Sequence, residues 1–383
     1  MGISKLKFNR IVSDIYIVAI SLSLFLHIFN KAELIPGVKL FYIPVLISAL
    51  LGTYLFYKKA QLYAFVVVFI SFTAISAIVS FSGTAISALI NLVLIVLSTY
   101  GLRNVEMDRL LKINAYLIPV ALIWLFLIYI REPVYRFQGY YNDPNYLSTT
   151  LLAFLYMLLL LINRSKSKLL NLLYIIEVFI LLLLILFTIS RTGIACSLLI
   201  LIVALLGSIK KHPVIASIIG VVGIVSFSHF FMNVFDEQAY VLEQRLNNDD
   251  NLSSAGNLRM ELSLQGVEYV LENPFRWVIG LGLGETERED AIPFRKDFHR
   301  DHNTVTSCFT EQGVMAFLFY FLILLKIWIS LHRRRDLQKS EKLLRQTFFL
   351  VLGLFSLSIW QMTYLPYWWL LFLLDNRKII YSS

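Results

Sequence analysis

Residues 169–189 have the sequence LLNLLYIIEVFILLLLILFTI, in which Glu177 is the only charged residue. A helix that crosses a bilayer needs about 20 consecutive, mostly apolar residues, and similar runs recur along the chain. Of the 383 residues, 58% are hydrophobic and 15% are charged, whereas a soluble domain is about 45–50% apolar and about 25% charged. The composition therefore excludes a soluble enzyme and predicts an all-α integral membrane protein.

Twelve apolar runs are long enough to be predicted as membrane spans. They cover residues 11–29, 38–57, 61–80, 84–100, 113–130, 146–162, 169–189, 192–209, 214–232, 303–331, 344–362 and 367–380. Only Ser190 and Arg191 separate the seventh run from the eighth. When the connecting loops are assigned alternately to the two sides, one side holds most of the lysine and arginine. Because such loops face the cytoplasm, both termini are predicted to be cytoplasmic.

The domain organisation follows from one long connection. Residues 1–232 are predicted to form a nine-helix N-terminal membrane region, residues 233–302 a loop subdomain on the outer side, and residues 303–383 a three-helix C-terminal membrane region. Apolar residues at helical spacing over 234–246 and 258–271 predict two or three helices within this loop.

Four polar stretches lie on the outer side, where topology does not require cations. The first stretch contains Arg136, Gly139, Tyr140, Asn142, Asp143 and Asn145, and the second contains Ser190, Arg191 and Gly193. The third contains Asn257 and Arg259 and continues to Gly280, Gly282 and Gly284. The fourth contains His299, Arg300, Asp301, His302 and Asn303 and continues to Glu311 and Gly313. The glycine series lacks the context of a nucleotide-binding motif, and it predicts a loop that presses closely against another segment.

In this order, the motifs resemble the O-antigen ligase and O-antigen polymerase family of polytopic membrane proteins. The ligase pattern is His-Asn, nine residues, Gly, two residues, and then Gly, Thr or Tyr. His302, Asn303 and Gly313 match this spacing, whereas Ala316 occupies the last position. The resemblance therefore implies a polymerase, with a ligase that transfers the polymer to lipid A core as the alternative.

The resemblance also implies the surroundings of the reaction. The expected donor and acceptor are undecaprenyl-diphosphate-linked oligosaccharides, and the expected active site faces the periplasm from the bacterial inner membrane. A membrane protein that regulates chain length is an expected partner, besides the lipid bilayer itself. No cofactor, metal ion or nucleic acid is expected.

Arginines suit a reaction that releases a lipid diphosphate, because the guanidinium group binds phosphate oxygens in pairs and stays charged. Four arginines are predicted to bind the diphosphate, namely Arg136, Arg191, Arg259 and Arg300. Arg191 and Arg259 are also predicted to act in catalysis by stabilising the leaving group. The alternative is that these side chains contact lipid phosphates or acidic loop residues.

Transfer of a sugar also needs a base, and His302 is the predicted catalytic base because imidazole titrates near neutral pH. Predicted supporting residues are His299, Asp301, Asn303, Asn145 and Tyr140. A structural alternative is that His302 only caps the tenth span. A metal site at the two histidines is disfavoured, because a third or fourth ligand would have to come from elsewhere.

A transporter or flippase of lipid-linked oligosaccharide is an alternative from another functional class. It predicts ionisable residues along a path through the bilayer. Here Asp14, Glu177 and Lys326 are ionisable residues inside the predicted spans, and a structural role is favoured for Glu177. The distribution of charge therefore favours an enzyme that works at the outer surface.

Overall fold

A computed structural model describes residues 2–29, 31–35, 38–56, 60–131, 136–141, 143–209, 263–287, 303–357 and 359–377 of the chain. The first half contains α1 (Gly2–His27), β1 (Glu33–Ile35), β2 (Val38–Lys39), α2 (Tyr42–Phe56), α3 (Ala60–Ser80), α4 (Gly83–Tyr100), the 3-10 helix η1 (Gly101–Asn104), α5 (Met107–Arg131), α6 (Pro144–Arg164) and α7 (Lys168–Phe187). The second half contains α8 (Arg191–Ile209), a helix over 263–272, α12 (Pro274–Ile279), η2 (Glu285–Glu287), α13 (Thr304–Arg333), α14 (Lys339–Ser356) and α15 (Leu365–Leu374). The two strands pair with each other in an antiparallel hairpin.

The described helices are those of a multi-pass membrane protein. Among the described residues, six segments are long and apolar enough to cross a bilayer, and they are Phe8–His27, Gly83–Asn104, Met107–Arg131, Pro144–Arg164, Lys168–Phe187 and Thr304–Arg333. The same part of the chain also contains shorter apolar helices at Tyr42–Leu55, Ala64–Ser80, Arg191–Ala204 and Leu365–Leu374. The ninth predicted span, over 214–232, lies outside the described residues, as does the loop helix predicted over 234–246.

Three predicted spans differ from the observed helices. The span predicted over 38–57 starts with strand β2, and its helix begins only at Tyr42. The helix predicted over 344–362 begins earlier, at Lys339, and ends at Ser356, and residues 359–364 are not helical. Pro366 follows this stretch and occupies the start of α15, where a fixed φ angle suits a first helical turn but not a helix interior. Helix α15 ends at Leu374, before the predicted end at residue 380, because the side chains of Asp375 and Asn376 bond to η1.

Large apolar side chains remain exposed along the helices, as a hydrocarbon environment allows. On α2 the exposed fractions are 45% for Ile43, 49% for Leu46 and 66% for Leu50. These residues recur at helical spacing, so they form a continuous stripe. Leu169, Leu172 and Phe179 are likewise exposed on α7. Stripes of this length are rare on soluble monomers, and they fit contact with lipid.

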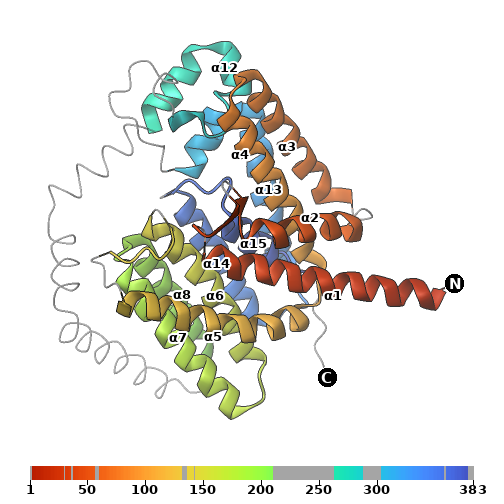
Figure 1. Cartoon of the computed structure of the whole chain (residues 1–383), viewed down its shortest axis with the longest axis vertical. Helices are drawn as coiled ribbons and strands as arrows, with labels where there is room; N and C mark the ends of the chain where they lie inside the picture. Colours follow the sequence, from red (N-terminus) through yellow and green to blue (C-terminus); the bar gives the residue numbers. More distant parts are fainter. Residues whose placement is uncertain are drawn as a thin grey trace. The chain divides into compact units, whose positions relative to one another are not determined.

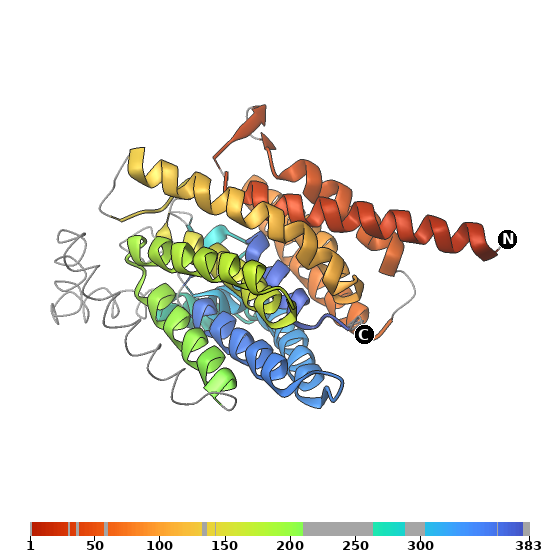
Figure 2. The ribbon, with the colours of Figure 1, turned by 90° about the horizontal axis from the view of Figure 1, so that it is seen from below.

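The described helices belong to two compact units. Unit 1 comprises residues 1–117, 257–333 and 352–383, and unit 2 comprises residues 118–256 and 334–351. In unit 1, α2 packs against α1 and α4, and α3 packs against α13 (Figures 1 and 2). The interior of this unit is aromatic: Trp368 contacts the rings of Phe69 and Tyr320, and the Tyr320 and Tyr367 hydroxyls lie 2.5 Å apart.

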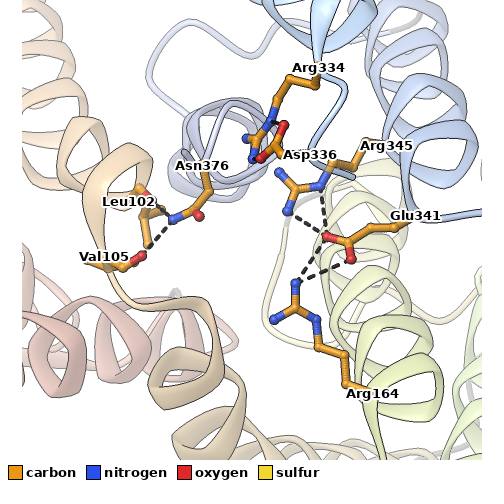
Figure 3. Close-up of polar contacts among 8 residues, drawn as sticks. All are labelled: Leu102, Val105, Arg164, Arg334, Asp336, Glu341, Arg345 and Asn376. Carbon is orange, nitrogen blue, oxygen red and sulfur yellow. Dashed lines mark hydrogen bonds and ion pairs between the residues drawn. The ribbon is translucent and has the colours of Figure 1, made fainter. Parts of the chain in front are cut away.

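Hydrogen bonds and an ion pair fix the end of the described chain to η1 in unit 1. Arg103 Nε lies 2.6 Å from Asp375 Oδ2, and both side chains are buried. Asn376 Nδ2 donates to the carbonyl oxygens of Leu102 at 2.6 Å and Val105 at 2.9 Å (Figure 3). These bonds satisfy backbone carbonyls that would otherwise be left without partners near an apolar core.

Unit 2 is built on α6, which is buried along almost its whole length and packs against α7 and α8 (Figure 1). An ion triad holds α6 to α14, since Glu341 accepts from Arg345 Nη2 at 2.8 Å and from Arg164 Nη2 at 3.1 Å (Figure 3). Nearby, hydrogen bonds from Arg334 lower the pKa of the Asp336 carboxyl.

Candidate functional site

The break between α7 and α8 was predicted from Ser190 and Arg191, and it is confirmed. Helix α7 ends at Phe187, and Ile189 has a φ of 48°, a left-handed conformation that interrupts a helix. Arg191 is the first residue of α8, and its side chain is exposed. The turn therefore presents Arg191 at a helix N-terminus, where the helix dipole adds positive potential.

Three hydrogen bonds connect the segment from Arg136 to Ser148 with this turn. The backbone N–H of Phe137 donates to the carbonyl of Phe187 at 2.9 Å. Ser190 Oγ donates to Asn145 Oδ1 at 2.6 Å, and the hydroxyls of Ser148 and Thr188 lie 2.9 Å apart. The turn-centred site, defined as Arg136, Asn145, Ser190 and Arg191 in unit 2, thus collects residues that the sequence had placed on one side of the membrane.

Gly193 allows α8 to approach α6 closely at this site. A Cβ atom at Gly193 would lie 2.7 Å from Ser148 Oγ and 3.1 Å from Ser190 Oγ, and the first of these distances is too short for any side chain. The Gly193 N–H also donates to Ser190 Oγ at 3.0 Å. The Ser-Arg-Thr-Gly motif therefore has a packing requirement at its glycine and a hydrogen-bonding requirement at its serine.

In unit 1, hydrogen bonds between side chains and backbone groups fix the start of α13. Asn303 Oδ1 accepts from the N–H groups of Val305 at 2.9 Å and Thr306 at 3.3 Å, which makes Asn303 the N-cap. Thr304 Oγ1 donates to the carbonyl of Ile359 at 2.5 Å and accepts from the Gln361 N–H at 2.9 Å. Capping of the tenth span, the alternative role considered for His302, is thus performed by Asn303.

Helix α13 is interrupted at Gly313, and the glycine series packs into the interruption. Gly313 has a φ of 80°. The Leu281 N–H donates to the carbonyl of Thr310 at 2.9 Å, and the Gly282 N–H donates to that of Glu311 at 2.8 Å. A Cβ atom at Gly280 would lie 2.4 Å from the Glu311 carbonyl carbon. The prediction that these glycines press against another segment is confirmed, and the loop supplies donors to carbonyls on a broken membrane helix.

Glu311 is fully buried beside this interruption and is satisfied on both carboxylate oxygens. Thr286 Oγ1 donates to Oε1 at 2.6 Å, and Trp360 Nε1 donates to Oε2 at 3.1 Å. The neighbouring Gln312 accepts from Thr73 Oγ1 at 2.7 Å. Glu311 and Gln312 therefore bond to three segments that are distant in sequence. These are α3, the loop after the glycine series and the stretch before α15.

Replacing Trp360 by phenylalanine is expected to lower the free energy of unfolding by about 1.5–3 kcal/mol, the contribution of a hydrogen bond to a charged group. The substitution keeps an aromatic ring but removes the donor to Glu311 Oε2. Thermal unfolding in detergent measures the effect. Trp277→Phe is the matched control, since Trp277 is 43% exposed. Equal unfolding temperatures for both variants would contradict a stabilising role for this bond.

Several predicted site residues lie outside the described residues, and they are Arg259, His299, Arg300, Asp301 and His302. Tyr140 is half-buried in the segment that Phe137 ties to the turn. Within the described part of the chain, no group of three or more His, Cys, Asp or Glu side chains could hold a metal ion.

Sequence reasoning missed Arg276 and Glu285, which line a cavity in unit 1. Glu285 is only 3% exposed, and its carboxylate accepts from the Ser82 hydroxyl at the N-cap of α4. A Gly-x-Gly-x-Gly-Glu sequence was the available signal, because a carboxylate directly after a closely packed loop is held in a defined place. Arg276 gave no signal, since it lies in a helix of six residues.

Comparison with known families supports the resemblance. Residues 176–321 match the family model described as O-Antigen ligase. This stretch includes Arg191, the glycine series and Gly313, together with Arg259 and His302. No curated protein matches the chain. Residues 176–321 of this multi-pass membrane protein are thus similar to the O-antigen ligase family.

Proposed function

We propose that the protein is a glycosyltransferase that polymerises oligosaccharide repeat units linked to undecaprenyl diphosphate, at the periplasmic face of the bacterial inner membrane. The family match supports the class of substrate. The turn-centred site is the observation that carries the proposal, because Phe137 and Asn145 are hydrogen-bonded to the α7–α8 turn that ends in Arg191. Two arginines next to one turn suit a diphosphate.

In the proposed reaction, the growing chain leaves its lipid carrier and joins the next lipid-linked unit. His302 takes the proton from an acceptor hydroxyl, and the hydroxyl oxygen bonds to the anomeric carbon of the donor. The bond between that carbon and the diphosphate oxygen breaks, and the diphosphate departs with the electron pair. A single displacement inverts the anomeric carbon.

The arginines would take the place of an electrophilic metal. Each charge-assisted hydrogen bond contributes about 1.5–3 kcal/mol, and such bonds act in catalysis when they are stronger to the departing diphosphate than to the bound donor. Arg136 and Arg191 would supply them from the turn-centred site, with Arg259 and Arg300 from the proposed periplasmic loop. Asn145 would position the turn through Ser190.

The test uses purified protein in detergent with undecaprenyl-diphosphate-linked oligosaccharide as the only substrate, in buffer containing EDTA. We expect a ladder of longer products on a gel, with the same rate when magnesium replaces EDTA. A ladder that needs added divalent metal would contradict the proposed role of the arginines. Heat-inactivated protein is the control for substrate breakdown.

A ligase is the second candidate, because the matching family model is described as O-Antigen ligase. The two functions share the donor and differ in the acceptor. Absence of a ladder, with transfer appearing once lipid A core is added, would assign the ligase. Absence of transfer to either acceptor would favour a flippase or transporter.

A further inference from the structure

A cavity of about 370 Å³ lies in unit 1, between the end of α3 and the segment from 269 to 285. Its volume is at the lower end of the range for small-molecule sites, about 300–1,000 Å³. The lining residues that bear on its chemistry are Ser80, Tyr269, Asn273, Phe275, Arg276 and Glu285. None of them belongs to the turn-centred site, which is in unit 2.

The polar groups of the cavity carry opposite charges. Glu285 is buried and held by Ser82, so its carboxylate has a fixed place in the wall. Arg276 is half-buried, and its guanidinium donates to no described residue. One cation and one carboxylate together disfavour a phosphate or diphosphate, because the carboxylate repels a second anion while the arginine attracts it. They also disfavour a purely apolar ligand, because burying these charges beneath it would remove their hydration.

The remaining lining groups narrow the chemistry further. Tyr269 is half-buried and packs on Val270 and Leu281, and Phe275 is 64% exposed. Such rings offer apolar faces, whereas Arg276 donates and Glu285 accepts hydrogen bonds. A sugar ring has this dual character, with C–H groups on its faces and hydroxyls at its edge that both donate and accept.

We propose that this cavity is a saccharide subsite that binds sugar residues of the oligosaccharide repeat unit. The assignment rests on the proposed function, since that function supplies the oligosaccharide. Arg276 donates to hydroxyl oxygens, Glu285 accepts from a hydroxyl, and Phe275 covers one face of the sugar. The cavity is a binding site without a part in bond breaking, so its effect on the reaction is on substrate affinity.

The test measures binding of the lipid-free oligosaccharide repeat unit to the full-length protein in detergent by calorimetry. Arg276→Gln is expected to weaken binding at least about tenfold, the equivalent of one hydrogen bond to a charged group. Phe275→Ala is expected to weaken binding several-fold. Trp277→Ala is the matched control, because Trp277 is an exposed aromatic residue of the same helix that does not line the cavity; it should leave the Kd within about twofold.

Each outcome decides the proposal separately from the enzymatic function. Unchanged affinity in both Arg276→Gln and Phe275→Ala overturns the saccharide subsite even if the wild-type protein makes a ladder. Competition by inorganic pyrophosphate at the same site also overturns it, in favour of an anion site. Weaker binding by Arg276→Gln and Phe275→Ala, but not by Trp277→Ala, supports the saccharide subsite. This result counts even if the protein forms no ladder, because binding of the free oligosaccharide does not require transfer.

Discussion

Replacement of His302 by alanine is expected to reduce polymer formation by about 10²–10⁴-fold, the usual contribution of a general base. The acceptor hydroxyl is a weak nucleophile until its proton is removed, and alanine cannot accept that proton. The α13 helix should remain in place, because Asn303 caps it and Thr304 ties it to Ile359 and to Gln361. The measurement is the initial rate of ladder formation by equal amounts of folded, detergent-solubilised protein.

A histidine at the opposite end of the same helix provides the control. His332 lies in the last turn of α13, and His332→Ala should retain the wild-type rate. Size-exclusion profiles and unfolding temperatures of the two variants should agree with those of the wild type. Retention of more than about a tenth of the wild-type rate in the His302 variant would be too small a loss for a general base and would remove His302 from the mechanism.

The positions of most helices could be predicted from the sequence because membrane spans are decided by local composition. The apolar run at 169–189 predicted a span, and the observed helix is Lys168–Phe187 with Ser167 as N-cap. The break before Arg191 was also predictable, since a charged residue is costly in the middle of a span. Local composition failed at 344–362, where residues 359–361 bond to Thr304 and Glu311 instead of continuing a helix.

The candidate site was only partly predictable. Motif order singled out the arginine and glycine stretches, and the structure joins Arg136, Asn145 and Arg191 around one turn. By contrast, the bond between Trp360 and Glu311 links residues 49 positions apart, and neither residue type indicates its partner. The cavity at Arg276 and Glu285 likewise depends on how the 269–285 segment folds against α3. Contacts of this kind follow from tertiary packing and leave no spacing pattern in the sequence.

Gly313 and Gly193 illustrate one physical requirement met in both units. At each, a segment with a motif approaches another so closely that no Cβ atom fits. Close approach of this type lets backbone groups bond directly, as Leu281 does with Thr310. A membrane interior lacks water to satisfy such groups, so the glycines at the interruption of α13 allow its carbonyls to be bonded directly.

Substitution of Gly313 by alanine is therefore expected to lower the free energy of unfolding by about 2–6 kcal/mol, from a left-handed backbone costing about 1–3 kcal/mol and from overpacking costing about 1–3 kcal/mol. The new Cβ atom would lie 2.2 Å from the carbonyl oxygen of Val278, and a backbone atom cannot rotate away. Gly353→Ala in α14 is the matched control, because nothing lies within 4 Å of its Cβ position. An alanine in a helix stabilises by about 0.5–1 kcal/mol relative to glycine, so this control should unfold at or above the wild-type temperature. Unfolding of Gly313→Ala must separate α13 from the glycine series. If Gly313→Ala and Gly353→Ala unfold at the same temperature, the interruption of α13 does not depend on this close contact.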